Sequence, residues 1–246
     1  MNPVQATSNS FSPPGSLGWL DLFLRADAWI LREWMRRRQL NVVWFCVCSI
    51  VVGAGLYGAA LGSWRDGLQA LYTAIKLPLV LLLTALGNGL LNGMLAPLLG
   101  LNVTFRQSLV LVLVSFAIAA IVLGGLSPVA WFLVWNTPPL SRLTRPSSAE
   151  YAFLQLTLAI FIAFAGIIGN VRLLPLLRQW ANNKTVALKV LFAWLSVNLF
   201  LGSQIAWLLR PFIWEAGRQV EFIGRQNLHG SFYETVFDAA RRLILP

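Results

Sequence analysis

The stretch "LPLVLLLTALGNGLLNGMLAPLLG", residues 77–100, carries no charged side chain. About 20 apolar residues in a helix cross the roughly 30 Å of hydrocarbon in a membrane. The stretch is therefore long and apolar enough to be a membrane-spanning helix. Its most polar residues, Thr84, Asn88 and Asn92, recur every four positions and so share one helical face.

The composition of the whole chain is that of a membrane protein. Of its 246 residues, 57% are hydrophobic and 11% are charged, whereas about a quarter are charged in an ordinary soluble domain. The net charge is +10, but the basic residues stand beside apolar runs, as in "REWMRRRQ" at 32–39 and "VRLLPLLRQW" at 171–180. We interpret them as topology signals and contacts with membrane lipids, and we expect no nucleic-acid partner.

Five apolar runs are long enough to span a membrane. They lie near residues 40–62, 78–100, 108–127, 151–171 and 187–209. We therefore expect an all-α integral membrane protein, with a bundle of about five transmembrane helices at 40–210. The segment "SPVAWFLVW" at 127–135 is too short to cross alone, and we predict that it is an interfacial or re-entrant piece.

The two ends of the chain differ from its middle. Residues 1–18 are rich in Ser, Pro, Asn and Gly, which predicts a disordered arm. Residues 19–39 place basic and apolar side chains on opposite faces, which predicts an amphipathic interfacial helix. We expect a second amphipathic helix in the tail at 211–246, where an apolar stripe either docks on a partner or rests on lipid: Phe232, Val236, Phe237 and Leu243.

The distribution of basic residues predicts the orientation of the chain, because cytoplasmic loops carry an excess of Lys and Arg. More of them fall on the side of the N-terminus: Arg25, Arg32, Arg36, Arg37, Arg38, Arg106, Arg172, Arg178, Lys184 and Lys189. The loops on the other side hold Arg65, Lys76, Arg142 and Arg145, and the tail, counted from Arg210, adds five more, of which Arg241 and Arg242 lie too far from the last span to count strongly. We expect a cytoplasmic N-terminus and a C-terminus on the opposite side.

The second span combines its polar stripe with small residues. Gly89 and Gly93 form a GxxxG motif beside the stripe, and such motifs let another helix approach closely. Helix packing is favoured over a solute path for these residues. Gly58 and Gly62 form a second GxxxG in the first span, which is a weaker signal. Asn198 and Gln204 give the fifth span a polar side.

The fifth span ends in a group of interface anchors. Arg210 can reach lipid phosphates or the last helix carbonyls, and Pro211 prevents the helix from continuing. Trp207, Phe212 and Trp214 are aromatic residues of the kind that gather at the headgroup level.

Residues that carry catalysis are scarce inside the spans. The nine acidic residues lie outside the spans or at their edges, and the sole histidine, His229, is in the tail. Cys46 and Cys48 are two positions apart and so point to different faces of a helix. We expect no enzymatic activity, no metal site and no cofactor.

Four segments resemble an uncharacterised family of bacterial multi-span membrane proteins with a Yip1-like layout. They are "AIKLPLVLLLTAL" at 74–86, "LLGLNVTFRQSL" at 98–109, "GSQIAWLLRPFI" at 202–213 and "SFYETVFDA" at 231–239. The resemblance covers residues 65–246 and implies a five-span bundle in the bacterial inner membrane with a cytoplasmic N-terminus. It also implies roles in membrane organisation and protein partnering rather than catalysis.

These features lead to two expected functions. The first is a non-enzymatic inner-membrane scaffold or accessory subunit, whose partners are membrane lipids and other membrane protein subunits. The second is a channel or transporter for a neutral or small solute, with a path lined by Thr84, Asn88, Asn92, Asn198 and Gln204.

Overall fold

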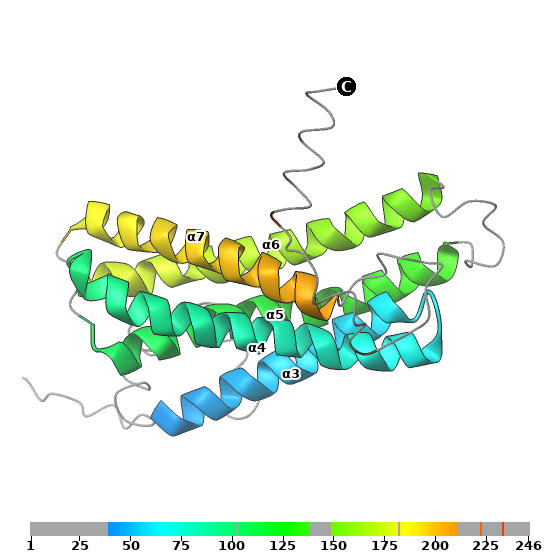
Figure 1. Ribbon diagram of the computed structural model, residues 1–246, viewed down its shortest axis with the longest axis horizontal. Coiled ribbons are helices and arrows are strands. Elements are labelled where there is room, and N and C mark those ends of the chain that lie inside the picture. The colour runs from blue at the N-terminus through cyan, green and yellow to red at the C-terminus, as the bar shows by residue number, and fades with distance from the viewer. Residues whose placement is uncertain are drawn as a thin grey trace, which may run out of the picture.

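The structure is a computed structural model that describes residues 39–101, 103–137, 149–181 and 183–210, together with residues 222 and 233. Across these residues the chain is helical and holds no strand. In Figure 1 the helices lie side by side along the longest axis of the molecule. They are α3 (Gln39–Gly62), α4 (Gly67–Leu98), α5 (Phe105–Asn136), α6 (Ala149–Trp180) and α7 (Lys184–Leu209).

The predicted elements at the two ends lie outside the described residues. These are the arm at 1–18, the interfacial helix at 19–39 except for its last residue, and the tail at 211–246 except for Phe222 and Tyr233.

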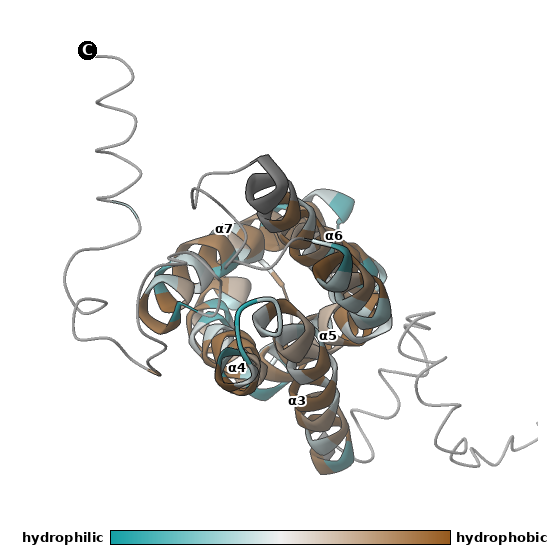
Figure 2. Cartoon of the chain, turned by 90° about the vertical axis from the view of Figure 1, so that its right-hand side faces the viewer, coloured by the Kyte–Doolittle hydropathy of each residue, from teal (hydrophilic) through white to brown (hydrophobic). Residues whose placement is uncertain are grey.

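All five helices are long and apolar enough to cross a membrane. The prediction of an all-α protein with five spans is therefore confirmed. Figure 2 looks along the bundle and shows hydrophobic residues, in brown, predominating in the helices. Large apolar side chains such as Trp44 and Leu199 are 68% and 75% exposed. Such an apolar perimeter suits lipid, and the five helices indicate a membrane-embedded, multi-pass protein.

The prediction of a separate, interfacial or re-entrant piece at 127–135 is wrong in that the segment is not separate, because α5 continues through it to Asn136. Pro128 lies inside this helix and has no N–H to donate to the carbonyl of Gly124, four residues earlier. The hydroxyl of Ser127 donates to that carbonyl instead, over 2.7 Å. The helix thus passes a proline without leaving a carbonyl unpaired in an apolar environment.

Three helices extend beyond the spans that the sequence predicts. Each of α4, α5 and α6 has 32 residues, so each is about 48 Å long and exceeds the hydrocarbon thickness of about 30 Å. Lys76, Arg172 and Arg178, which the sequence analysis assigned to loops, lie inside α4 and α6. Helices of this length either tilt or project from the membrane at one end.

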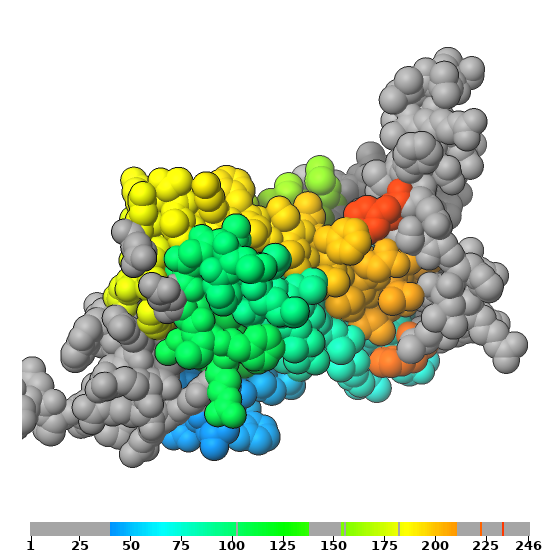
Figure 3. Space-filling model, turned by 60° about the vertical axis from the view of Figure 1, so that its left-hand side comes forward, coloured from blue at the N-terminus to red at the C-terminus, as the bar shows by residue number. Residues whose placement is uncertain are grey.

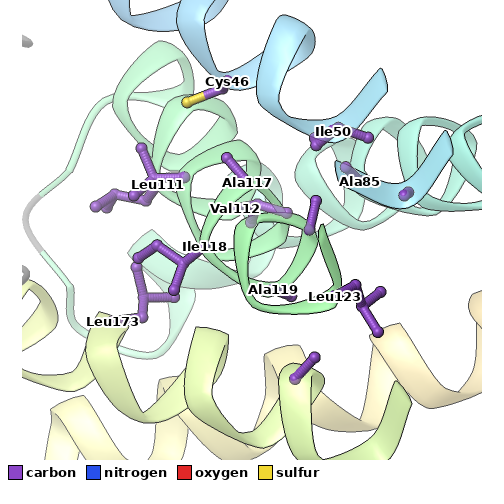
Figure 4. Packing of buried hydrophobic residues seen from close by; sticks show 14 of the residues in the cluster. Cys46, Ile50, Ala85, Leu111, Val112, Ala117, Ile118, Ala119, Leu123 and Leu173 are labelled. Carbon is purple, nitrogen blue, oxygen red and sulfur yellow. The ribbon is translucent and has the colours of Figure 1, made fainter. Parts of the chain in front are cut away.

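The best-buried helix is α5, which packs against α3 on one side and α6 on the other. In the most apolar stretch of each helix, 56% of the residues of α5 but 22% of those of α7 are buried. Figure 4 shows Cys46 and Ile50 of α3 above α5, and Leu173 of α6 on its other side. The predicted opposite faces of the two cysteines are confirmed, because Cys46 is buried and Cys48 is exposed.

Glycines bring α5 into backbone contact with both neighbours. A Cβ atom on Gly53 of α3 would lie 2.1 Å from the carbonyl oxygen of Ala120, and one on Gly124 would lie 3.0 Å from the Cα of Gly53. On the other side, a Cβ on Gly169 of α6 would lie 2.5 Å from the carbonyl oxygen of Ser115. At Gly53 and Gly169 the crossing helices leave no room for any side chain.

A methyl group at the first crossing should separate α3 from α5. We expect Gly53→Ala to lower the stability of the purified protein by about 1–3 kcal/mol, because a packed backbone must move. Gly125→Ala is the matched control, since no atom lies within 4 Å of the added methyl. This control should be neutral or slightly stabilising. The measurement is thermal unfolding in mild detergent, and equal melting of the two variants would contradict the crossing.

Candidate functional site

The polar stripe of the second span lies inside the bundle and faces α7. Thr84, Asn88 and Asn92 are 2%, 0% and 0% exposed. Figure 3 shows α7, in yellow to orange, along α4, in teal. Asn88 contacts Asn198, and a Cβ on Gly202 would lie 3.7 Å from the hydroxyl of Thr84. Moving one turn back along α4 thus moves one turn forward along α7, so the two helices are antiparallel.

Three asparagine side chains form a hydrogen-bonded chain between these helices. The amide nitrogen of Asn92 donates to the amide oxygen of Asn88, one turn away on α4. The amide nitrogen of Asn88 in turn donates to the amide oxygen of Asn198 on α7. Such bonds inside a membrane contribute about 0.6 kcal/mol on average and up to about 2 kcal/mol. The hydrogen-bonded asparagines therefore join α7, the least buried helix, to the rest of the bundle in one register.

The two GxxxG motifs make different kinds of contact. Gly89 and Gly93 make room for side chains of α5, because their Cβ atoms would lie 2.6 Å from Leu109 and 2.3 Å from Phe105.

Gly58 and Gly62, which the sequence analysis gave less weight, meet the backbone of α4. Their Cβ atoms would each lie 2.5 Å from a carbonyl oxygen, of Thr73 and Gln69 respectively. The motif with the weaker signal therefore supports the closer helix contact.

Gln204 and the interface anchors lie toward the end of α7. The amide oxygen of Gln204 is buried and has no hydrogen-bond partner among the described residues, and Gln204 does not extend the asparagine chain.

Arg210 follows the helix with a left-handed backbone (φ 40°), and its N–H donates to the carbonyl of Ala206 over 2.8 Å. Its guanidinium lies over the Trp207 ring, 4.6 Å from the centroid. Pro211, Phe212 and Trp214 lie outside the described residues.

The part of the tail that the structure describes contacts the membrane helices. The ring of Tyr233 stacks on that of Phe200, with centroids 5.0 Å apart, and its hydroxyl donates to the carbonyl of Phe200 over 2.8 Å. The hydroxyls of Tyr233 and Ser203 are 2.6 Å apart and hydrogen-bonded.

Tyr233 gave no sequence signal, although it stands in the segment "SFYETVFDA", because a single aromatic residue does not indicate what it contacts. Phe232, Val236, Phe237 and Leu243 lie outside the described residues.

Across the described ranges, no three His, Cys, Asp or Glu side chains come together as metal ligands would. The predicted lack of a metal site, a cofactor and enzymatic activity stays a prediction.

No protein family model, curated protein sequence or solved structure matches this chain. The resemblance to the Yip1-like family therefore stays a prediction. The class of protein comes from the fold: a multi-pass helical membrane protein with a line of hydrogen-bonded asparagine side chains between α4 and α7.

Removing the acceptor at the end of the asparagine chain should destabilise the bundle. Asn198→Leu leaves the Asn88 amide nitrogen without its acceptor in apolar surroundings, and we expect a loss of about 1–3 kcal/mol. Ser196→Leu is the control, since it makes a polar-to-leucine change on the exposed side of the same helix. The melting temperature in mild detergent is the readout. An unchanged value for Asn198→Leu would show that the bond does not hold α7.

Proposed function

We propose that this protein is a non-enzymatic scaffold or accessory subunit of a larger membrane assembly, with membrane lipids and other membrane protein subunits as its partners. The supporting observation is the outward face of α7. This face keeps large apolar side chains exposed, and such a face can take up a neighbouring helix.

The two faces of α7 differ in burial and in residue type. Asn198 and Gly202 lie against α4, whereas Phe192 and Leu199 are 68% and 75% exposed. Between these large residues lies Ser196, whose hydroxyl donates to the carbonyl of Phe192 over 3.0 Å. Small residues such as serine are enriched on the surfaces where transmembrane helices associate.

Passage of a neutral or small solute is the second candidate function. The observation in its favour is that Thr84, Asn92 and Gln204 carry buried polar atoms with no hydrogen-bond partner among the described residues. Against it, Asn88 and Asn92 are fully buried and bonded to each other and to Asn198, so these amides form no open path in this conformation. The scaffold role is therefore the better supported.

The proposed location is the bacterial inner membrane, with the N-terminus in the cytoplasm and the C-terminus in the periplasm. The turns that follow α4 and α6 lie together, because Leu101 and Ala181 form an isolated bridge. Arg106 and Lys184 stand beside these turns, and since the helices alternate in direction, the start of α3 is at the same end. This clustering of bases supports a cytoplasmic location for that end.

A photo-crosslinking amino acid on the outward face of α7 should capture a protein. We expect p-benzoylphenylalanine in place of Phe192 to give a discrete protein adduct in native membranes. The same probe in place of Val52, which is 59% exposed on α3, is the control and should give lipid adducts. Adducts would be separated by gel electrophoresis and identified by mass spectrometry. A lack of any protein adduct at Phe192 would contradict the scaffold role and leave the solute path as the better-supported function.

The proposed orientation predicts which termini can be labelled from outside. In a chain whose two cysteines are replaced by alanine, Ser231→Cys should react with a membrane-impermeant maleimide in spheroplasts, whereas Asn9→Cys should react only after lysis. Equal reaction of both before lysis would rule out five spans with the termini on opposite sides.

A further inference from the structure

Three of the most deeply buried polar side chains have hydrogen-bonding atoms that no described residue satisfies. They are the amide oxygen of Asn92 on α4, the hydroxyl of Ser108 on α5 and the indole N–H of Trp194 on α7. The three residues are 0%, 0% and 1% exposed. Buried polar atoms are nearly always hydrogen-bonded, and the cost of leaving one unpaired rises where water is excluded.

The helix register places Asn92 and Trp194 at the same level of the bundle. Asn88 of α4 is bonded to Asn198 of α7, and the two helices run in opposite directions. One turn further along α4 is Asn92, and one turn earlier along α7 is Trp194. Both residues therefore lie one turn from the same hydrogen bond, on the faces that α4 and α7 present to each other.

Ser108 comes to this level from α5. Gly89 and Gly93 of α4 face Leu109 and Phe105, so the turn of α5 that carries Ser108 lies beside the turn of α4 that carries Asn92. Ser108 also lies two turns before Ser115, whose carbonyl faces Gly169 of α6. Its side chain is therefore on the side of α5 that packs toward α6, and it is fully buried.

The fourth helix contributes an apolar side chain near this level. Leu176 of α6 lies two turns beyond Gly169, which places it near the level of Ser108, and it is fully buried. The three polar atoms therefore lie near one level of the bundle that α4, α5, α6 and α7 form.

The geometry points to a closed binding site at this level for a small neutral molecule that both donates and accepts hydrogen bonds. Asn92 offers an acceptor, Trp194 a donor, and Ser108 either. No charged side chain is among them, so an ion would lack a counter-charge. Water and small amides share the required chemistry, and water typically binds where two to four polar groups converge.

This site does not depend on the proposed scaffold role or on a solute path. A closed site needs no opening through the bundle, so the result of crosslinking at Phe192 neither supports nor contradicts it.

The sign of one stability change tests the site. If nothing is bound, Ser108→Ala removes an unpaired buried hydroxyl and should raise the melting temperature. If a guest is bound, the same change removes one of its partners, and we expect the full-length protein to melt lower by about 2–4 °C. Ser127→Ala in the same helix calibrates the loss of a bonded hydroxyl, because the Ser127 hydroxyl donates to Gly124. A melting temperature for Ser108→Ala that is unchanged or raised would overturn the proposal.

Nuclear magnetic resonance on the full-length protein in lipid nanodiscs identifies the guest. The indole N–H signal of Trp194 is assigned by its loss in Trp194→Phe. A cross-peak from this proton to water would establish water as the guest. A saturable shift on titration with acetamide, reduced in Ser108→Ala, would establish a small amide. An indole signal that shows neither effect would overturn the proposal even if Ser108→Ala melts lower.

Discussion

Backbone contact between α5 and its neighbours is the constraint on which the bundle depends. In a bilayer the hydrophobic effect does not drive helices together, because lipid tails are as apolar as leucine side chains. Association therefore relies on close packing, which small residues permit. Gly53 allows α3 to rest on Ala120 of α5, and Gly169 allows α6 to rest on Ser115 from the other side. With α5 between them, these contacts define where α3 and α6 lie.

The attachment of α7 follows a different principle. This helix has the fewest buried residues in its apolar stretch, and a polar chain joins it to α4 through Asn88 and Asn198. Apolar packing tolerates small shifts of one helix along another. A hydrogen bond between two side-chain amides forms only where the donor of one meets the acceptor of the other. The hydrogen bond of Asn198 therefore sets the position of α7 along α4. The same attachment leaves Phe192 and Leu199 facing outward.

The two ends of the bundle have different characters. At one end, the turns after α4 and α6 meet at Leu101 and Ala181. At the other end, the tail contacts the helices: Phe222 packs edge-on against Tyr72 of α4, with centroids 5.4 Å apart. Lys76 is buried beside these rings, with its amine 5.3 Å from the centroid of Phe222. A cation over aromatic faces is stabilised by their quadrupoles, so this end joins the tail to the membrane helices by polar as well as apolar contacts.

The sequence by itself determined the five apolar helices, because the length and hydropathy of a run are local properties. Local periodicity also placed Thr84, Asn88 and Asn92 on one face, and it separated Cys46 from Cys48. The expectation of a separate piece at 127–135 was wrong, because α5 continues past Pro128, where the Ser127 hydroxyl bonds the carbonyl of Gly124.

Only the tertiary structure decided which residues meet. Asn88 and Asn198 are 110 positions apart. Either asparagine alone indicates a polar helix face but does not indicate which residue it bonds. Ser108 and Trp194 gave no sequence signal, because single serines and tryptophans are common in apolar runs. Likewise, Gly53 meets Ala120 through the folding of α3 onto α5. Helix formation depends on neighbours in the chain, whereas these contacts depend on how separate helices pack.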